Sequence, residues 1–425
     1  MDNVQAALYP EDRWANEFAY LGRDPISFED TISPRFHEFE REAVFRESWL
    51  FIGRVEHVAK PGQYFTKEIE VLKTSVLVTR DQAGQVHAFY NVCPHRGNKL
   101  VWDTHANVEV QGQCRNFVCK LHGIGFAPDG SLSRLTDPSS WYGEQGRKLR
   151  LAKIPMETWN GFIFVNLRPG GPKESLREFI GEPFWQGFDG LPFDLLTERH
   201  KFVLECNANW KLMMDGFSEG YHGATTHQAI IPIGNFFDPD ELKLRQQHFG
   251  IYGRHRQFVA PRIPDGLYSF PIEELAVANP TGPRYPMPFE MPILPHGADP
   301  TGFENWGTSA NMLWPNMHLQ VYYPGYYVTY AFWPLGYDRM RFELEMYMPQ
   351  SRNFSELFSH KVGAGLFVEA ALQDFSLLEA TQQGLENRAF AGYPVTDQEI
   401  LVREFHHKIY EAVRNYQEAL GARPA

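Results

Sequence analysis

NVCPHRGNKLV (residues 91–101) and FVCKLHGIGF (residues 117–126) are the two most informative stretches of this sequence. In the first, one residue separates Cys93 from His95, and in the second, two residues separate Cys119 from His122. Each pair lies just after an apolar segment that is typical of a strand. Thiolates and imidazoles are ligands for zinc and for iron–sulfur clusters, so the two pairs predict a metal site.

The order of the ligands distinguishes between these metals. A Cys₂His₂ zinc site usually pairs like with like, as C-x₂₋₄-C followed by H-x₃₋₅-H, and this sequence lacks that arrangement. Two cysteines on one iron and two histidines on the other form the Rieske type of [2Fe–2S] cluster, in which neutral imidazoles raise the reduction potential. We therefore interpret Cys93, His95, Cys119 and His122 as the ligands of a Rieske cluster.

A second group of metal-ligating residues lies in NANWKLMMDGFSEGYHGATTHQ (residues 207–228). Here four residues separate His222 from His227. On an ideal helix a five-residue step turns by about 500°, which leaves the two side chains about 140° apart. They can bind one ion only if the helix distorts or ends between them, which Gly223 permits. Two histidines and one carboxylate form the ligand set of Fe(II) that activates O₂.

Composition excludes several other classes of protein. The chain has 425 residues, which predicts two or three domains, and its net charge of −12 argues against nucleic acid as a partner. No apolar run is long enough for a membrane helix, and the first residues do not resemble a signal peptide. Four cysteines are too few for a disulfide scaffold, so we expect a cytoplasmic protein in which Cys114 and Cys206 are ordinary buried thiols.

The patterning predicts an α+β protein. We expect a helix at 33–49, with Ser33 as its N-cap, and short strands with turns from residue 64 to about 166, including a strand at 68–80. A further strand-rich stretch covers 317–348, and ten prolines at 261–300 indicate a long ordered loop.

Two helices are expected at the end of the chain. The first covers about 355–383, and the second begins at a capping box made by Thr396 and Glu399. An apolar stripe on the second helix is predicted to be buried, and it consists of Leu401, Phe405, Ile409, Tyr416 and Leu420. The predicted domains are a helical segment at 1–48 that packs on the catalytic domain, a Rieske domain at 49–168 and a catalytic domain at 169–425.

Three motifs together resemble the large (alpha) subunit of Rieske non-haem iron oxygenases of the aromatic-ring-hydroxylating type. They are CPHRG…CKLHG, the E-x-Y-H-x₄-H sequence around the histidine pair, and ALQDFSLLEATQQGL (residues 371–385). Three features depart from the family pattern. The spacer of 23 residues between His95 and Cys119 is longer than expected, Ile124 replaces a frequent Trp, and Gly216 replaces a frequent Asn.

The resemblance implies roles for several acidic residues. Asp374 would be the carboxylate ligand of the catalytic iron, with Glu369 and Glu379 as alternatives. Glu219 would connect His222 to the cluster ligand His122 across a subunit boundary. For this bridge Asp215 is the alternative.

The resemblance also implies a fold and an activity. The fold would combine a small β-sandwich Rieske domain with a helix-grip catalytic domain, an antiparallel sheet with helices. The protein would be a homotrimer, possibly with a beta subunit, that receives NAD(P)H-derived electrons from a separate ferredoxin or flavin reductase. It would use O₂ to dihydroxylate or monohydroxylate an aromatic or alicyclic molecule, as in aromatic hydrocarbon catabolism. Oxidative N- or O-demethylation is the alternative, and an electron carrier without oxygenation is a further one.

Overall fold

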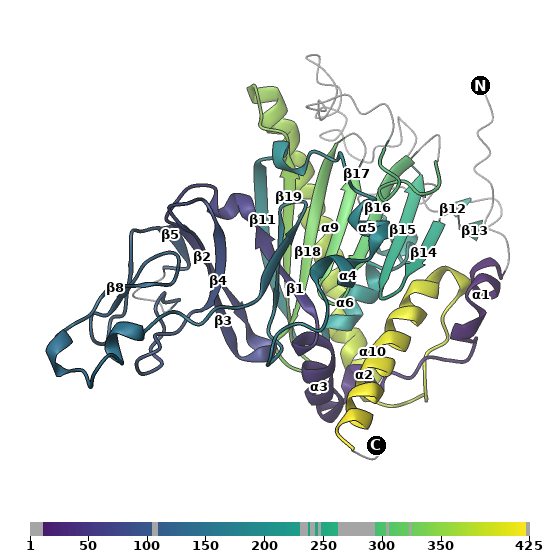
Figure 1. Cartoon of the computed structure of the whole chain (residues 1–425). Helices are drawn as coiled ribbons and strands as arrows, with labels where there is room; N and C mark the ends of the chain where they lie inside the picture. Colours follow the sequence, from purple (N-terminus) through teal and green to yellow (C-terminus); the bar gives the residue numbers. More distant parts are fainter. Residues whose placement is uncertain are drawn as a thin grey trace. The chain divides into compact units, whose positions relative to one another are not determined.

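The computed structural model (Figure 1) describes residues 12–103, 109–229, 237–238, 243–244, 248–261, 294–302, 306–322 and 325–421. The chain forms two compact units, Phe45–Phe179 and the combination of Met1–Val44 with Ile180–Ala425. Helices and sheets occur together, so the predicted α+β class is confirmed. Most of the predicted proline-rich loop, part of the long spacer and Pro324 lie outside the described residues.

The unit Phe45–Phe179 is built from small antiparallel sheets. The strand orders are β4-β3-β2-β5, β6-β7-β8 and β1-β10-β9. The strands are β1 (Trp49–Arg54), β2 (Gln63–Ile69), β3 (Thr74–Arg80), β4 (Val86–Tyr90), β5 (Gln111–Gln113), β6 (Phe117–Val118), β7 (Gly125–Phe126), β8 (Leu132–Arg134), β9 (Met156–Trp159) and β10 (Phe162–Asn166). One apolar core joins the first two sheets, because Leu77, Phe89, Phe117 and Phe126 belong to the same buried cluster as Cys93 and Cys119.

The prediction of one continuous strand at 68–80 is wrong, because a turn divides this stretch between β2 and β3. A short 3₁₀ turn at Glu70–Leu72 follows β2, and Lys73 has a left-handed φ of 51° before β3 begins. The two strands then pair as an antiparallel hairpin, with Ile69 opposite Thr74. The apolar Val71 and Leu72 are buried in the turn itself, which explains why apolar pattern alone did not reveal the break.

The larger unit contains a seven-stranded antiparallel sheet with the order β11-β19-β18-β17-β16-β15-β14. Its strands are β11 (Glu198–Cys206), β14 (His248–Tyr252), β15 (His255–Pro261), β16 (Trp306–Leu313), β17 (Met317–Tyr322), β18 (Tyr326–Pro334) and β19 (Met340–Met348), and a separate pair is formed by β12 (Phe237–Asp238) and β13 (Lys243–Leu244). The strand-rich stretch predicted at 317–348 is therefore confirmed. Phe217 packs on one face of the sheet, against His318, Tyr330 and Phe342.

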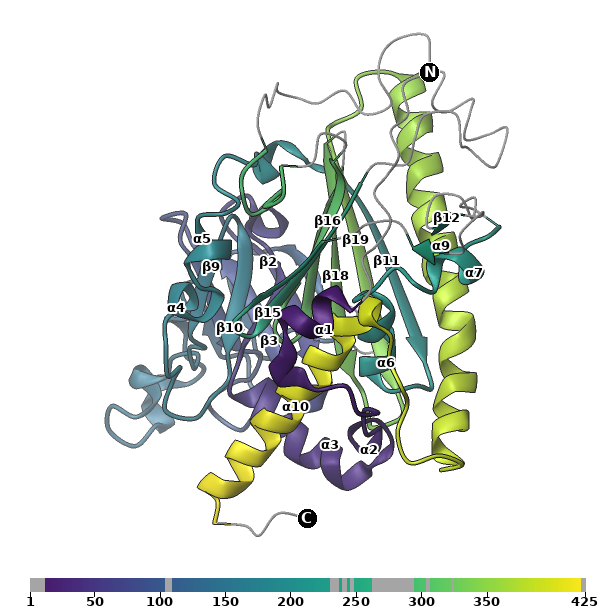
Figure 2. The same cartoon turned by 90° about the vertical axis from the view of Figure 1, so that its right-hand side faces the viewer.

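Helices accompany this sheet (Figure 2), and the long helix α9 (Phe354–Glu386) runs beside α7 (Gly223–Thr226). The other helices are α1 (Arg13–Glu17), α2 (Glu29–Ile32), α3 (Pro34–Glu40), α4 (Leu176–Ile180), α5 (Glu182–Trp185), α6 (Trp210–Gly216) and α10 (Ile400–Ala419). A buried ion pair fixes the start of α6 to α3. Lys211 Nζ lies 2.6 Å from Glu40 Oε1, and both side chains are fully buried.

The predicted helix ends are partly right. Ser33 caps α3 by accepting a hydrogen bond from the Phe36 amide, but α3 ends at Glu40, a π-helical turn follows, and β1 begins at Trp49. The capping box of Thr396 and Glu399 is confirmed. On α10 the predicted stripe is buried at Leu401, Phe405 and Ile409. Tyr416 is only half-buried, and Leu420 is 60% exposed because it follows the last turn of the helix.

A buried histidine connects the N-terminal segment, α6 and α10. His406 on α10 lies with Nδ1 2.6 Å from Asp30 Oδ2 and with Nε2 3.1 Å from Asp215 Oδ2. Burial lowers the pKa of His406, but attraction to Asp30 and Asp215 outweighs this effect and raises the pKa to about 10. The imidazolium is thus the counter-charge for two carboxylates from distant parts of the chain.

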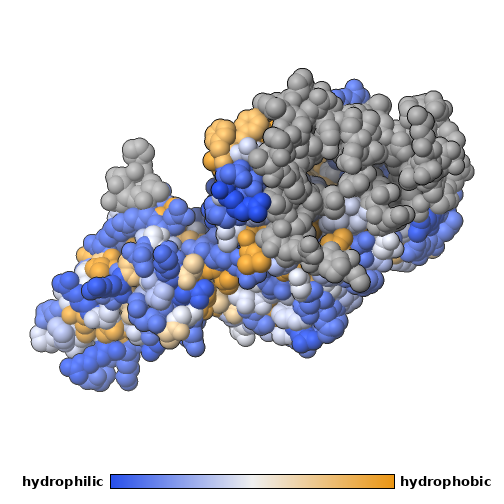
Figure 3. Space-filling view, turned by 90° about the horizontal axis from the view of Figure 1, so that it is seen from above, coloured by the Kyte–Doolittle hydropathy of each residue, from blue (hydrophilic) through white to orange (hydrophobic). Residues whose placement is uncertain are grey.

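The described surface seen from above is mainly hydrophilic, with small hydrophobic patches (Figure 3). Among the described helices, none combines the length and the apolar character that crossing a membrane requires.

We predict that His406→Gln destabilises the protein, by about 3–5 kcal/mol, because it leaves two buried carboxylates without a cation. A histidine with a raised folded-state pKa stabilises fully below its unfolded pKa, about 6.5, and this stabilisation is lost as the pH rises through about 10. Thermal unfolding of both proteins from pH 6 to pH 10 measures the effect. The difference in melting temperature should shrink as the pH rises, and a constant difference would show that His406 is neutral.

Candidate functional site

The two predicted cluster-binding pairs lie in loops with the same backbone hydrogen bonds. The amide of Cys93 donates to Asn98 O at 2.8 Å, and the amide of Gly97 donates back to Cys93 O at 3.0 Å. Cys119 repeats the pattern with Ile124 and Gly123, both at 2.8 Å. The glycines have φ values of 76° and 71°, a left-handed conformation that a side chain would strain. The repeated turn places each cysteine in the same backbone setting, with the histidine two residues later in the first loop and three residues later in the second.

The side chains on these loops fit the Rieske cluster. Cys93 and Cys119 are each 1% exposed and their thiols contact one another. The rings of His95 and His122 lie 4.7 Å apart, centroid to centroid. Both Nδ1 atoms are buried and have no hydrogen-bond partner among the described residues. Because a buried polar atom without a partner is unfavourable, these nitrogens are suited to bind a metal ion, which would satisfy them.

Sequence reasoning missed a side chain that covers this group. The ring of Trp141 lies 5.1 Å from that of His95, and its Nε1 donates to Thr136 O. Thr136 Oγ1 in turn donates to His122 O at 2.7 Å. Neither residue has a characteristic spacing from the ligand pairs, so the sequence carried no signal for them. Of the two other cysteines, which were predicted to be buried, Cys206 is buried and Cys114 is half-buried.

The second histidine pair is placed by a break between two helices. In this stretch the helix α6 ends at Gly216, and a single helical turn, α7, follows at Gly223–Thr226. His222 precedes that turn and His227 follows it, where the backbone leaves the helical conformation (φ −100°, ψ 17°). The break removes the 140° separation of an ideal helix, and the two rings lie 5.2 Å apart.

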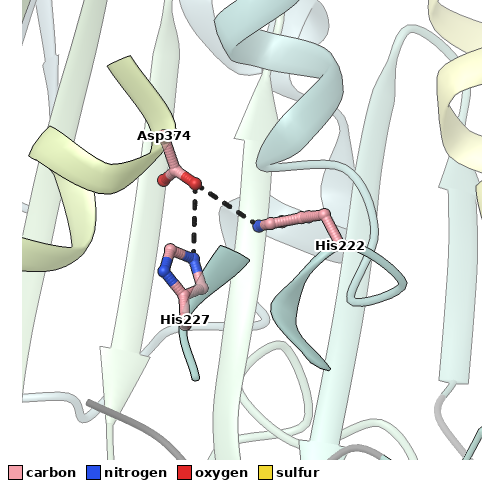
Figure 4. Close-up of side chains that lie close together, drawn as sticks. All are labelled: His222, His227 and Asp374. Atoms are coloured by element: carbon pink, nitrogen blue, oxygen red, sulfur yellow. Dashed lines mark ion pairs between the residues drawn. The ribbon is translucent and has the colours of Figure 1, made fainter. Parts of the chain in front are cut away.

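Asp374 on α9 completes the group from a distant part of the sequence (Figure 4). Its Oδ1 lies 3.6 Å from Nε2 of His222 and 3.3 Å from Nε2 of His227. One ligand atom from each residue falls within 4.8 Å of the others, and this is the one group of three or more such residues among those described. Burial raises the pKa of Asp374, and attraction to His222 and His227 offsets this effect only in part.

Glu219 contacts Nδ1 of His222, the ring nitrogen that does not face Asp374. Its Oε1 lies 2.5 Å from His222 Nδ1, while Oε2 accepts hydrogen bonds from the backbone amides of Tyr221 and His222. Burial lowers the pKa of His222, but attraction to Glu219 and then to Asp374 together outweighs burial and raises the pKa to about 9. The contact fixes Nδ1 as the protonated nitrogen, so Nε2 is left as the ligand atom.

The alternative acids point elsewhere. Asp215 contacts His406 through Oδ2 and is not part of the group of three. Glu379 accepts from the Asn207 amide at 2.9 Å, and Gln382 accepts from the Asn209 amide at 3.0 Å. These two contacts fasten α9 to the start of α6. Residues of the predicted E-x₂-Q motif therefore hold Asp374 in place relative to the histidines.

The neighbours of Asp374 on α9 are only partly buried. Leu372 is 44% exposed and Leu377 is 50% exposed, whereas Leu378 is buried. The Asp374 side chain itself is 15% exposed, because it points toward the histidines. The carboxylate is thus buried by the ligand group and not by its helical neighbours.

The donor set fits Fe(II). Two imidazole nitrogens and one carboxylate on one side of an ion leave other coordination positions open for O₂. Without a metal, protons on the imidazole nitrogens face the carboxylate of Asp374. A divalent cation would replace these protons and bind the same three side chains.

Two families match this chain. Residues 193–415 match the ring hydroxylating alpha subunit (catalytic domain), and residues 48–153 match the Rieske [2Fe–2S] domain. The first match alone covers more than half of the 425 residues. Together the two matches confirm the predicted fold class, a Rieske β domain with a helix-and-sheet catalytic domain.

Individual relatives include monooxygenases and a dioxygenase component. Choline monooxygenase of Beta vulgaris, a chloroplastic protein, is 24% identical over 90% of this chain and 75% of its own length. The large oxygenase component of the naphthalene 1,2-dioxygenase system of Ralstonia sp. is 32% identical over 48% of this chain and 44% of its own length. The crystal structure of a quaternary ammonium Rieske monooxygenase with an inhibitor matches 96% of this chain and 99% of its own, with a TM-score of 0.70 and 18% identity.

The family determines the cofactors. The Rieske domain carries a [2Fe–2S] cluster, and the catalytic domain of this family binds a mononuclear iron. The donor groups described above are the places where this chain offers matching ligands. The chain belongs to the ring-hydroxylating alpha-subunit family and is the terminal component of a Rieske oxygenase.

Proposed function

We propose that this oxygenase hydroxylates an aromatic or alicyclic small molecule, by cis-dihydroxylation or monohydroxylation. Cys93, His95, Cys119 and His122 would hold the cluster. His222, His227 and Asp374 would hold the catalytic Fe(II). The observation that carries the proposal is the convergence of these last three side chains, whose ligand atoms lie within 4.8 Å of one another.

The two metal groups divide the work. When bound, the cluster would supply single electrons and the Fe(II) would supply an open site for the activation of O₂ next to the substrate. The chain's own task is to hold the ligands. Glu219 fixes the tautomer of His222, and the contacts of Glu379 and Gln382 fix α9. Family members act on small substrates and take electrons from a partner reductase or ferredoxin.

We infer that electrons pass between subunits of a homotrimer, with Glu219 joining His222 of one subunit to the cluster ligand His122 of the next. The geometry of Glu219 supports this role, because one carboxylate oxygen is already on His222 Nδ1. Its other oxygen is held by backbone amides, which orients the group. A ferredoxin or flavin reductase would supply the electrons, and a beta subunit is compatible with this assembly.

An aromatic substrate is supported by the sheet face near the ligand group. Phe217, Tyr330 and Phe342 pack together there. Burial, and in addition the charge of Asp374, raise the pKa of Tyr330, so this aromatic group lies close enough to the ligand group to sense its charge. The Arg256 guanidinium places a positive charge near His318, farther along the same face of the sheet. Burial and then this charge lower the pKa of His318 to about 3, so this face disfavours a further cation. A neutral aromatic guest suits this wall better than a cation does.

Oxidative N- or O-demethylation is the second candidate. It is supported by the similarity to a choline monooxygenase over 90% of this chain, since that relative is a monooxygenase.

We also propose a cytoplasmic location, which the four free cysteines support. We propose functional domains at 1–48, 49–168 and 169–425. The grouping of Met1–Val44 with Ile180–Ala425 in one contact unit supports an N-terminal segment that packs on the catalytic domain.

Metal content tests the ligand assignment. We predict about three iron and two acid-labile sulfide per chain in anaerobically purified protein, two irons in the cluster and one in the catalytic site. His222→Ala or Asp374→Ala should lower the iron to about two and abolish turnover while the visible Rieske spectrum stays. Cys93→Ala is the converse control and should abolish that spectrum. Wild-type protein with two iron and two sulfide that takes up no added Fe(II) would favour an electron carrier.

Glu219→Gln tests the bridge between the metal groups. The variant keeps the size of the side chain and a hydrogen-bond acceptor but removes the charge, so we predict normal content of both metals. Product formation in a single turnover of the reduced enzyme should slow by about 10–100-fold, the range found for partners of metal ligands. A wild-type rate would exclude Glu219 as the bridge. Asp215→Asn, tested in parallel, should leave that rate much less affected.

Substrate class is tested by O₂ uptake with the reduced enzyme and three probes. They are a bicyclic aromatic hydrocarbon, an aryl methyl ether and a quaternary ammonium compound. We predict uptake coupled to hydroxylated product with the hydrocarbon, because the wall is aromatic and lies near a buried cation. Formaldehyde release from the ether would favour demethylation, and coupled uptake with the ammonium compound alone would contradict an aromatic substrate.

A further inference from the structure

Helix α9 contributes more than one side chain to the ligand group. Gln373 directly precedes Asp374, and its Oε1 lies 3.0 Å from Nδ1 of His227. Its Nε2 donates to Glu369 Oε1 at 3.1 Å, one helical turn earlier. We propose that Gln373, held by Glu369, is a positioning residue that fixes the tautomer and ring orientation of His227. This inference rests on the proposed role of His227 as an iron ligand.

The two nitrogens of His227 have different surroundings. Nε2 faces Asp374 Oδ1 at 3.3 Å, so it is the atom available to a metal. A metal-bound nitrogen uses its lone pair, which requires the proton to be on Nδ1. An acceptor must therefore stand at Nδ1, and the amide oxygen of Gln373 occupies that position.

Glu369 determines which end of the amide faces the histidine. An amide could present either its oxygen or its NH₂ group to His227. The carboxylate of Glu369 accepts hydrogen bonds only, so it must receive the NH₂ group. The oxygen is then directed to Nδ1, and the chain Glu369–Gln373–His227 allows a single arrangement of its hydrogen atoms.

The two histidines are thus supported by different chemical groups. A carboxylate, Glu219, stands at Nδ1 of His222, whereas a neutral amide stands at Nδ1 of His227. A carboxylate partner makes an imidazole a stronger ligand than an amide partner does, because it stabilises positive charge on the ring. We infer that the neutral partner makes His227 the weaker of the two nitrogen ligands.

The packing of α9 does not by itself require this pair. Glu369 is exposed and Gln373 is only half-buried, so in the absence of His227 both would be expected to face water. Their contact is an exposed helical i, i+4 pair, a type that adds only about 0.2–0.5 kcal/mol to stability. The arrangement is better explained by the histidine that it orients.

Fe(II) affinity, measured by competition with a chelator on full-length protein with an intact Rieske spectrum, tests the proposal. Gln373→Leu keeps the size but removes the acceptor, and we expect about 10–100-fold weaker binding of Fe(II). The double variant Gln373→Glu with Glu369→Gln exchanges acceptor and donor along the chain, so it should restore binding to within a few-fold. Gln383→Leu makes the same change at an exposed position on α9 and should have no effect.

The readouts separate this inference from the iron site itself. If Gln373→Leu binds Fe(II) as the wild type does, or if the double variant is as weak as the single one, the positioning role is excluded. His227→Ala serves as the reference. Loss of iron in His227→Ala with full binding in Gln373→Leu overturns only the role of Gln373, whereas wild-type binding in His227→Ala overturns the proposed iron site.

Discussion

The catalytic unit depends on holding one carboxylate between two imidazole nitrogens. Asp374 Oδ1 must stay within 3.3 and 3.6 Å of nitrogens that lie about 150 residues earlier in the sequence. Helix α9 therefore has to keep its position along and around its own axis relative to α6 and α7. The bonds from Asn207 and Asn209 to Glu379 and Gln382 fix that position one to two turns beyond Asp374.

Charge balance explains several contacts that lie farther away. Each buried carboxylate of the larger unit that we have described meets a cation or a set of amide donors, because an unpaired buried charge is unfavourable. Glu40 meets Lys211. Burial raises the pKa of Glu40, but its contacts with Lys211 and His37 together outweigh burial and lower that pKa. Asp215 meets the imidazolium of His406. These pairs fasten α3 and α10 to α6, which leads directly to the histidines.

Local sequence signals identified what is encoded within a few residues. The ligand pairs at Cys93 and Cys119, the Ser33 cap and the Thr396 capping box all depend on spacings of two or three residues. Contacts such as His406 with Asp30, or Gln373 with His227, join residues more than 140 positions apart and leave no local pattern. The exposure of Leu372 and Leu377 leaves no local pattern for the same reason, since exposure depends on which neighbour covers a face.

The neutral partner of His227 is consistent with the charge of the whole group. One Fe(II) carries two positive charges, and Asp374 with Glu219 supplies two negative ones, so the buried assembly is close to neutral. A carboxylate in place of the Gln373 amide would add an uncompensated negative charge next to a ligand. The negative charge in this part of α9 belongs instead to Glu369, which is exposed and can be solvated by water. The amide therefore transmits the orienting effect of a carboxylate to His227 while keeping its charge away from the iron.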